Sequence, residues 1–596
     1  MAYRSLTDEE INILDDNGCW AEDWNNVSVS DDFVPQYMRH VMLYGEIAIG
    51  SFNKNVEVSQ GFLKHSGIYN ATLRNVSVGD DCLIENIGNY INNYTIGNDC
   101  RLSNISTIET TEGATYGQGN LVSVLNDGGD GNVALFNGLS SQIAALMVRR
   151  NRDKDFWAAL RRLISEDIKA TAPDRGTLGD GVKIVNTNEI TNALVGKECE
   201  IDGAARLSDV TILSSEDATV YIGTGVICEN SIISNGSSLT NSVKMQDCFV
   251  GEACKISNGF TASQSLFFAN CLMSNGEASS AFCGPFATIH HKNTLVAGSQ
   301  FSFCDVDAAN IPNHAGKMPL PDTEGTFCVC LGKLTRHPNT HDLPFSYVKA
   351  DGDTMRLEPG RNIISATLYR DVRKWPKRDV RPKETRKSIV NFDWLSPFSV
   401  EQVVKGKQVL ENLRAASGED VSAYNYHGFV IDASALRDGI RYYDMALRVY
   451  MGVVLNRVLN RDLPLTQPTT DIADDHWNNL SGLLLPASEE ERVVNDVKTG
   501  ELDSIDAVLS RLADINAHYG ECQWAWTYDL ILRYYHLQGL DEESLARVKH
   551  DCAVARKAWI AEIREDAEEE FKKGNLAPDS IESFFLQLDH EIEEEN

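Results

Sequence analysis

Bulky apolar residues recur every six positions in the first part of the chain. The series is Val78, Ile84, Tyr90, Ile96, Leu102 and Ile108. Neither the helical period of about 3.6 residues nor the strand period of about two produces this spacing. The hexads that begin at Val78-Gly and Ile96-Gly are also identical at three positions. Three hexads make one coil of short parallel strands, so the pattern predicts a prism of stacked coils with the apolar residue inside.

The same pattern resumes after an interruption. Val195-Gly, Ile222-Gly and Val250-Gly open further hexads, and apolar residues follow at six-residue steps at Ile201, Leu207, Ile256, Ala262 and Phe268. Cysteine stands four residues after the apolar residue in four hexads, at Cys82, Cys100, Cys199 and Cys254. Free cysteine packs as a small hydrophobe, so we expect these thiols inside the coils. Asn-rich phrases between the hexads suit corners, because Asn tolerates positive φ. The pattern predicts a left-handed parallel β-helix of hexapeptide repeats.

Helical periodicity appears in two other places. Apolar residues among Arg and Lys from 143 to 164 predict helices inserted between the coils, and the region after residue 398 has the pattern of successive helices. The expected fold is therefore mostly β with a large α part. The predicted order is an N-terminal segment (1–43), first coils (44–132), a helical insertion (133–178), second coils (179–330), a basic β and loop region (331–397) and an acidic helical domain (398–596).

Charge and composition restrict the partners of this chain. Its 596 residues include 54 Lys and Arg against 86 Asp and Glu, a net charge of −32. Such an acidic chain does not favour nucleic acid or an anionic membrane surface as a partner. The start has no basic region followed by an apolar stretch, and no window is apolar enough to span a membrane, so we expect a cytoplasmic protein. The 14 cysteines are then expected as free thiols.

One segment departs strongly from the acidic background. From Arg370 to Lys387 there are nine Lys and Arg against three Asp and Glu. Arg and Lys bind phosphate groups by charge and by forked hydrogen bonds. The segment is a candidate phosphate-binding element, or alternatively an internal ion-pair partner for the acidic helical domain.

Several phrases together resemble one family. They are Ser66-Gly-Ile-Tyr-Asn-Ala-Thr-Leu, Val78-Gly-Asp-Asp-Cys, Leu125-Asn-Asp-Gly-Gly, Gly284-Pro-Phe-Ala-Thr-Ile-His-His-Lys, Asn313-His and Lys374-Trp-Pro-Lys-Arg-Asp. They resemble an uncharacterised family of long bacterial proteins, a family of unknown function in the trimeric hexapeptide-transferase (LpxA-like) superfamily. The resemblance covers about residues 35–400. It implies a β-helix with a helical insertion, and it does not imply a settled activity.

Histidines are the leading candidates for catalysis. Transferases with this fold use a histidine as general base, and imidazole suits the task because its pKa lies near neutrality. The candidates are His290, His291 and His314. Adjacent side chains on a strand point to opposite faces, so we expect only one of His290 and His291 to serve a given site. The alternative is that these histidines stack in a coil or anchor a loop.

The remaining site residues are assigned to ligands. The motifs offer Tyr69, Asn70 and Asn313 as substrate contacts. The basic segment offers Arg373, Lys374, Trp375, Lys377 and Arg378 as contacts for a phosphorylated co-substrate, with the indole available for stacking. No tightly bound cofactor and no metal site are expected, although a zinc site built from these histidines, or from Cys328, Cys330, His337 and His341, is an alternative.

The sequence hypothesis is a transferase of the hexapeptide class. It would move an acyl group from an acyl-coenzyme A co-substrate to a sugar or sugar nucleotide. The alternatives are a non-catalytic sugar-nucleotide or metabolite-binding protein, a protein similar to sugar-phosphate nucleotidyltransferases, or a structural scaffold. The superfamily implies a homotrimer, whereas the helical parts could instead cover the prism faces and leave a monomer or dimer.

Overall fold

The chain forms two compact units. The computed structural model describes residues 3–125, 132–292, 294–303, 305–306, 325–331, 339–352, 354–418, 420–460, 472, 474–573 and 578–593. The solenoid unit consists of Met1–Met318, Asp379–Ile389 and Val497–Leu509. The helical unit consists of Pro319–Arg378, Val390–Asp496 and Ser510–Asn596. Each unit is described by itself.

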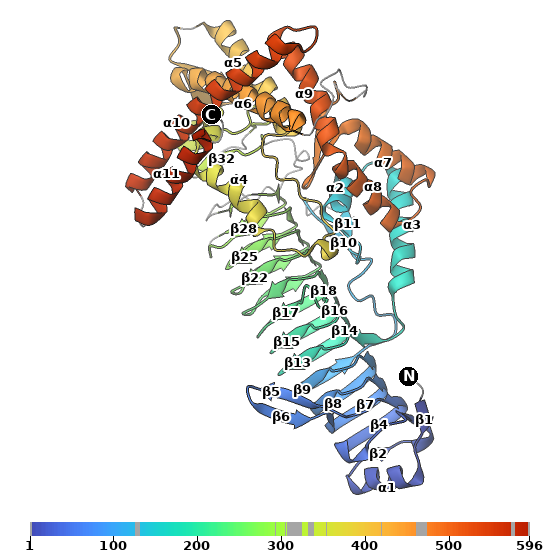
Figure 1. Ribbon diagram of the computed structural model, residues 1–596. Helices are drawn as coiled ribbons and strands as arrows, with labels where there is room; N and C mark the ends of the chain where they lie inside the picture. Colours follow the sequence, from blue (N-terminus) through green and yellow to red (C-terminus); the bar gives the residue numbers. More distant parts are fainter. Residues whose placement is uncertain are drawn as a thin grey trace. The chain divides into compact units, whose positions relative to one another are not determined.

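The solenoid unit is a parallel β-solenoid whose described strands join into one 27-stranded sheet (Figure 1). Its first strands are β1 (Tyr3–Ser5), β2 (Trp20–Ala21), β3 (Val27–Ser30), β4 (Met38–Ile49), β7 (Gly67–Val78), β8 (Leu83–Ile96) and β9 (Arg101–Glu109). The later strands are β12 (Gly176–Leu178), β13 (Lys183–Val185), β14 (Glu189–Val195), β15 (Glu200–Asp202), β16 (Arg206–Ile212), β17 (Tyr221–Ile222), β18 (Ile227–Ile233), β19 (Ser238–Leu239), β20 (Lys244–Gln246), β21 (Phe249–Val250), β22 (Lys255–Ser257), β23 (Thr261–Ser263), β24 (Leu266–Phe267), β25 (Leu272–Ser274), β26 (Glu277–Ser279), β27 (Phe282–Cys283), β28 (Thr288–Ile289), β29 (Leu295–Ala297), β30 (Gln300–Phe301) and β31 (Asp305–Val306).

Strand pairing aligns inward residues in columns. One column runs through Val78, Ile96, Leu178, Val195, Ile212, Ile233 and Val250. A second runs through Ile68, Ile84, Leu102, Ile184, Ile201, Ile222, Leu239 and Ile256, and a third through Leu73, Ile91, Ile108, Ile190 and Leu207. All these side chains are buried and belong to one core. The predicted prism of stacked coils is confirmed as a parallel β-solenoid.

One member of the six-residue series does not point inward. Tyr90 is 37% exposed and its hydroxyl donates to Glu109 Oε2, whereas the next residue, Ile91, is fully buried in the third column. The prediction that Tyr90 fills the core is therefore wrong. The strand pairing shifts register between Ile87 and Tyr90, and this irregularity moves the inward position by one residue.

The corners have the residue types that the sequence predicts. Asn70, Asn86, Asn104, Asn186, Asn241 and Asn258 all have positive φ. Their amides link successive coils, with Nδ2 to Oδ1 distances of 3.1 Å for Asn70 to Asn86, 2.9 Å for Asn104 to Asn186 and 3.1 Å for Asn241 to Asn258.

The cysteines in the hexads are also confirmed as interior residues. Cys82, Cys100, Cys199 and Cys254 are fully buried. The Cys82 thiol donates to the Gly97 carbonyl at 3.0 Å, and the Cys100 thiol donates to the Gly179 carbonyl at 3.2 Å. These thiols therefore connect one coil with the next.

The coils begin earlier than predicted. β2 and β3 pair in parallel with β4, so the first coil starts near Trp20 rather than near residue 44. Helix α1 (Asp8–Asp16) precedes it and begins with a capping box between Thr7 and Glu10. Two short 3-10 turns, η1 (Trp24–Asn26) and η2 (Pro35–Tyr37), complete this end.

Two excursions leave the solenoid and return in register. The first is the hairpin β5 (Asn55–Ser59) and β6 (Phe62–His65). The second follows β9 and contains the ribbon β10 (Leu121–Ser123) and β11 (Asn132–Ala134) and the helices α2 (Ser141–Arg149) and α3 (Lys154–Thr171). β12 then pairs directly with β8. The predicted helical insertion is present, and its excursion starts after Glu109 rather than at residue 133.

The helical unit combines a small sheet with long helices. Its sheet has the order β32 (Val329–Leu331), β33 (Tyr347–Asp351), β34 (Thr354–Glu358), β36 (Phe429–Asp432) and β35 (Ala423–Tyr426), and a separate hairpin joins β37 (Trp477–Leu480) to β38 (Leu483–Pro486). The helices are α4 (Ala366–Arg378), α5 (Pro397–Ser417), α6 (Ala433–Leu459), α7 (Ala487–Thr499), α8 (Ile505–Ala517), α9 (Tyr519–Tyr535), α10 (Glu542–Lys573) and α11 (Pro578–Glu593), with α7 and α8 divided between the units. Short turns η3 (Arg361–Ile364) and η4 (Lys383–Thr385) flank α4. Helix α6 packs against α5, α9 and α10.

The sequence did not predict α4, which lies in the expected basic β and loop region. Its buried side chains are Ala366, Leu368, Tyr369 and Val372, a one-sided set near the start of the helix. The charged positions between them obscured this pattern in the sequence. In the part of the chain that the structure describes, no helix is both long and apolar enough to cross a membrane.

The corner asparagines give a test of the coil geometry. Asn241 has a φ of 55° and donates to Asn258. Both variants lose the hydrogen bond to Asn258. Asn241→Ala keeps the Cβ in the left-handed region but lacks the amide that lets Asn adopt it, at a cost of about 1–2 kcal/mol, whereas Asn241→Gly removes the Cβ as well. We expect the alanine variant to be less stable than the glycine variant by about 1 kcal/mol in urea unfolding. Equal stability of the two variants would show that positive φ does not constrain this corner.

Candidate functional site

His290 and His291 lie in a turn at the edge of the solenoid coils. β28 ends at Ile289, so neither histidine is on a strand. The two rings meet edge to face with centroids 5.0 Å apart. His290 is half-buried and His291 is exposed. The expectation that the two side chains point to opposite faces is therefore wrong, because the alternation of a strand does not apply in a turn.

Backbone contacts fix the histidine turn. The Thr294 N–H donates to the His291 carbonyl at 3.1 Å, and Asn275 Nδ2 donates to the His290 carbonyl at 3.4 Å. Gly276 lies beneath the turn, where a Cβ would come within 2.7 Å of Ile289 Cγ2 and 3.0 Å of the Thr294 carbonyl. Glycine at this position lets two coils approach closely and holds the turn in place.

A polar groove of about 560 Å³ adjoins this turn on the solenoid. Its lining residues are Gly259, Thr261, Asn275, Gly276, Glu277, Lys292, Thr294 and Leu295. Glu277 and Lys292 are exposed and place one negative and one positive charge beside it. We call this feature the histidine groove after the turn beside it; Lys292 of that turn is among its lining residues, whereas His290 and His291 are not.

Thr294 offers an unusual hydroxyl in the histidine groove. Its residue is only 2% exposed, and its Oγ1 has no hydrogen-bond partner among the described residues. Buried polar groups are nearly always paired, so an unpaired hydroxyl in the lining of a groove is a candidate ligand contact. No motif in the sequence singled out this residue.

The histidine turn and the groove beside it together offer groups that suit proton transfer and polar recognition. Imidazole accepts a proton near neutral pH, a hydroxyl donates to a developing oxyanion, and an ammonium group attracts a phosphate or carboxylate. Among the described residues, no group of three His, Cys, Asp or Glu side chains is placed to hold a metal ion.

Tyr69 and Asn70 lie far from the histidine groove. Both are on β7, and nine coil-to-coil steps separate β7 from β28 along the same column of strands. At about 4.8 Å per step, the separation is about 40 Å. Asn70 belongs to the corner ladder through its hydrogen bond to Asn86. Burial raises the pKa of Tyr69. Within one chain, these residues and the histidines cannot contact one small ligand.

The other predicted residues belong to other parts of the chain. Asn313, His314 and His337 lie outside the described residues. The basic segment is in the helical unit up to Arg378 and in the solenoid unit from Asp379. On α4, the Arg373 guanidinium lies 3.6 Å from the centroid of the Tyr369 ring, and Trp375 stacks on Phe327. Lys374, Lys377 and Arg378 are exposed.

Family comparison places most of the chain in one group. The model described as "Domain of unknown function (DUF4954)" matches residues 3–320 and 318–414. The chain belongs to the DUF4954 family. A second model, "Domain of unknown function (DUF6819)", matches residues 461–577. An uncharacterized protein of Treponema pallidum (strain Nichols) is 26% identical over 246 residues, which cover 39% of this chain and 34% of that protein.

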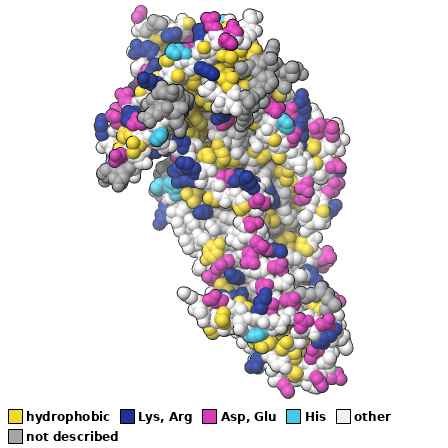
Figure 2. All heavy atoms as spheres, in the orientation of Figure 1, with side chains coloured by type: hydrophobic (Ala, Val, Ile, Leu, Met, Phe, Trp, Pro, Cys, Tyr) yellow, Lys and Arg dark blue, Asp and Glu magenta, His cyan; other side chains and the backbone are white. Residues whose placement is uncertain are grey.

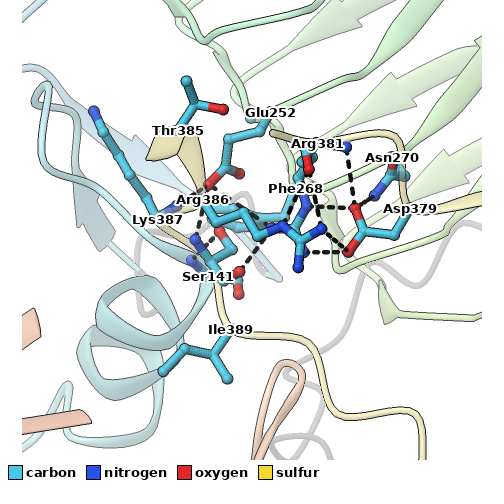
Figure 3. A network of polar contacts seen from close by, with 12 residues as sticks. Ser141, Glu252, Phe268, Asn270, Asp379, Arg381, Thr385, Arg386, Lys387 and Ile389 are labelled. Carbon is cyan, nitrogen blue, oxygen red and sulfur yellow. Dashed lines mark hydrogen bonds and ion pairs between the residues drawn. The ribbon is translucent and has the colours of Figure 1, made fainter. Parts of the chain in front are cut away.

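The DUF4954 region contains a buried polar network that we call the strap clasp (Figure 3). The strap is the segment Asp379–Ile389 of the solenoid unit. The Arg381 guanidinium binds Asp379 through Nε to Oδ1 at 2.8 Å and Nη2 to Oδ2 at 3.0 Å, and its Nη1 donates to the Ser388 carbonyl at 2.7 Å. The Arg381 side chain is only 2% exposed. Arg381 is therefore an internal ion-pair residue and is not available to a ligand.

Two solenoid residues attach the strap to the coils. Glu252 Oε1 accepts hydrogen bonds from the backbone N–H groups of Lys387 and Ser388 at 2.6 and 2.8 Å. Asn270 Nδ2 donates to Asp379 Oδ1 at 3.0 Å. The sequence placed Asp379 and Arg381 in one basic segment, and nothing in it indicated their solenoid partners.

Burial and pairing act in opposite directions on the pKa of Asp379. Burial raises this pKa, but the hydrogen bonds from Arg381 and Asn270 more than offset that effect and hold it below its usual range. Burial also lowers the pKa of Lys387, whose Nζ donates to the Asn137 carbonyl of the helical insertion. The strap clasp thus joins the strap, the coils and the insertion within one unit.

Asp379→Asn tests the strap clasp, because it removes the nearer of the two carboxylates that face the buried Arg381 guanidinium and leaves only Glu252, whose Oε1 is 3.9 Å from Nη1. We expect a loss of about 3 kcal/mol in the free energy of unfolding near pH 7, measured by urea unfolding. The pKa of Asp379 is lowered in the folded state, so its contribution is complete above about pH 4 and is lost as the pH falls further. The difference from wild type should therefore narrow in acid. The exposed Asp217→Asn is the matched control, with an expected change within about 0.5 kcal/mol. Equal stability of the two variants would contradict a structural role for the clasp.

Proposed function

We propose that this DUF4954 chain is a group-transfer enzyme of the hexapeptide class. It moves an acyl group from an acyl-coenzyme A to a hydroxyl or amino group of a sugar or sugar nucleotide. The observation that carries the proposal is the histidine turn, where two imidazoles in contact are followed by Lys292 and Thr294, which line the polar groove.

The coil architecture supports this class. Its hexads, inward cysteines and corner asparagine ladders are typical of left-handed hexapeptide β-helices, and we propose that handedness and repeat type here. The class to which the resemblance points uses histidine bases on such coils. Fold alone does not specify activity, so the proposal depends on the groove.

The reaction assigns each group one task. The acceptor oxygen or nitrogen forms a bond to the acyl carbon as the thioester C–S bond breaks. His291, the more exposed imidazole, takes the acceptor proton and returns it to the departing thiolate sulfur. His290 lies against His291 and positions its ring. Thr294 Oγ1 donates to the oxyanion or to an acceptor hydroxyl, and Lys292 attracts the acceptor's negative groups.

The exposed cations of α4 supply the proposed phosphate contacts of the donor. Lys374, Lys377 and Arg378 retain exposed side chains, whereas Arg373 and Trp375 are already engaged with aromatic rings of their own unit. We therefore assign the phosphate contacts chiefly to the three exposed cations. We propose that Arg373 and Trp375 stabilise the surface of α4 through their contacts with Tyr369 and Phe327.

We also propose a homotrimer, as the resemblance implies. The histidine groove opens on an outer face of the coils, where a neighbouring solenoid would add side chains to it. Light scattering coupled to size exclusion measures this state directly, and a monomer would overturn this part of the proposal.

Histidine variants test the catalytic assignment. We expect His291→Ala to lower turnover of acetyl-coenzyme A with a panel of sugar nucleotides by about 10²–10⁴-fold, measured as free thiol release. His290→Ala should have a smaller effect. His550→Ala, on the exposed face of α10, is the control and should match wild type.

The pattern of results separates the alternatives. Full turnover in both His290→Ala and His291→Ala would contradict the histidine base. Ligand binding without turnover in the wild-type protein would favour a metabolite-binding protein. Absence of binding to every donor and acceptor in the panel would leave a scaffold.

A donor comparison tests the α4 contacts. We expect Lys377→Ala/Arg378→Ala to raise KM for acetyl-coenzyme A by about tenfold with little change in kcat, because two phosphate contacts are lost. The same variant should use acetyl-pantetheine, which lacks the nucleotide phosphates, as well as wild type does. Arg437→Ala, an exposed arginine on α6, is the matched control. An equal effect on both donors would contradict phosphate recognition by α4.

A further inference from the structure

The helical unit contains a second cavity that the proposed acyl transfer does not use. Its volume is about 400 Å³. Its polar lining residues are Asn391, Asp393, Arg457, Asn516, Tyr519 and Gln523, and Val454, Val458, Ala517 and Gly520 complete the wall. They come from the segment before α5, from α6, from the end of α8 and from α9. We call it the arginine cavity.

A saturated carboxylate forms one side of the arginine cavity. Asp393 accepts from Arg457 Nη1 at 2.8 Å and from Nη2 at 3.2 Å. It also accepts from the Tyr519 hydroxyl at 3.2 Å and from Gln523 Nε2 at 3.3 Å. With four hydrogen bonds on two oxygens, Asp393 has little capacity left for a ligand.

Arg457 keeps donors for a ligand. Asp393 occupies the end of the guanidinium fork, where Nη1 and Nη2 each donate once. Guanidinium has five N–H donors, so Nε and one further N–H on each Nη have no partner among the described residues. The Arg457 side chain is 48% exposed. Burial alone would lower its pKa, but Asp393 more than offsets this effect and keeps the guanidinium charged.

The other open groups around the cavity are amides. The Asn516 side chain makes no hydrogen bond with the described residues, and the side-chain amide of Asn391 uses only its oxygen, which accepts from the Asp393 N–H at 2.9 Å. Gln523 is 3% exposed, and its Nε2 is committed to Asp393 and Tyr519. The cavity therefore offers more donors than acceptors.

A layer behind these residues fixes them in place. The Tyr450 hydroxyl and Thr527 Oγ1 lie 2.8 Å apart, and Thr527 donates to the Gln523 carbonyl at 2.7 Å. Burial and the nearby charge of Asp393 raise the pKa of Tyr519 well above its ordinary value, so the phenol stays protonated and donates. Sites with such supporting contacts lose little entropy when a ligand binds.

We propose that the arginine cavity binds a small oxyanion carried on a polyhydroxyl body, such as a sugar acid or a sugar phosphate. The open side of the guanidinium fork receives the carboxylate or phosphate in a forked contact, and Asn391 and Asn516 receive the hydroxyls. The volume is at the lower end of ligand pockets, which fits a ligand of about one sugar ring. This site is independent of the proposed acyl transfer.

The two family regions meet at this cavity. Asn391 and Asp393 fall in the DUF4954 match, and Asn516 to Gln523 fall in the DUF6819 match. Arg457 lies between the two matches. The proposed ligand would therefore require both regions in one chain.

Calorimetry on the full chain tests the proposal. The probes are glucuronic acid, galacturonic acid and glucose 6-phosphate, with glucose as the uncharged match and inorganic phosphate as the free anion. We expect at least one of the first three to bind at about millimolar concentration or below, and at least tenfold more tightly than glucose or phosphate. Preference for an acid or for the phosphate ester identifies the oxyanion. Binding of inorganic phosphate alone, or of none of the first three probes, would overturn the proposal.

Two variants locate the binding. Arg457→Lys keeps the charge and removes the fork, and we expect about tenfold weaker binding. Asn516→Leu fills the cavity without touching the ion pair, so it tests the site even if Arg457→Lys fails to fold. Arg448→Lys is the control, since Arg448 is on the same helix and pairs with Asp444 outside the cavity. Unchanged affinity in Asn516→Leu, or equal losses in Arg448→Lys, would overturn the assignment. The turnover assay of His291→Ala measures the proposed acyl transfer and does not report on binding in the arginine cavity.

Discussion

Register between successive coils is the constraint on which the solenoid unit depends. Each inward residue must continue a column, as Ile96 does between Val78 and Leu178. A slip of one residue would send a whole strand's apolar side chains to solvent. An inserted segment can therefore leave the solenoid only at a corner. The chain must then re-enter the solenoid in register with the coil it left. The excursion after Glu109 obeys this rule, because Ile108 pairs with Ile190 across the inserted helices.

The same constraint on register determines which residues pack in the core and which are available to a ligand. Residues inside the coils cannot reach a ligand, and burial makes their ionised forms costly, as for Cys228, whose pKa burial raises to about 12. Only turns and outward positions are open to chemistry. The histidine turn after β28 is such a position, and Gly276 beneath it shows that the coil below is built to receive the turn. The column of strands fixes the direction of this turn, and the backbone contacts of Thr294 and Asn275 hold it.

Sequence alone could predict the features that repeat. The hexads, the corner asparagines and the inward cysteines each recur, so one sequence contains several independent copies of the signal. Tyr90 was misplaced because a local shift of register leaves no trace in the six-residue spacing. The contacts of the strap clasp and the arginine cavity could not be predicted, because Glu252 and Arg381, or Asp393 and Arg457, meet only through tertiary packing. The placement of His290 and His291 in a turn likewise depended on where β28 ends, and strand ends are poorly marked in this sequence.

Both proposed sites must attract negative ligands to a chain with a net charge of −32. At distances beyond the Debye length of about 8 Å, salt hides most of this charge, so long-range attraction cannot be the source of recognition. Recognition must come from local donors with fixed geometry. The arginine cavity illustrates how this is possible, because Asp393 cancels the formal charge of Arg457 yet leaves one side of the guanidinium free to form a forked contact. Screening should then assist association by weakening the overall repulsion, in contrast to proteins that steer anions by a positive surface.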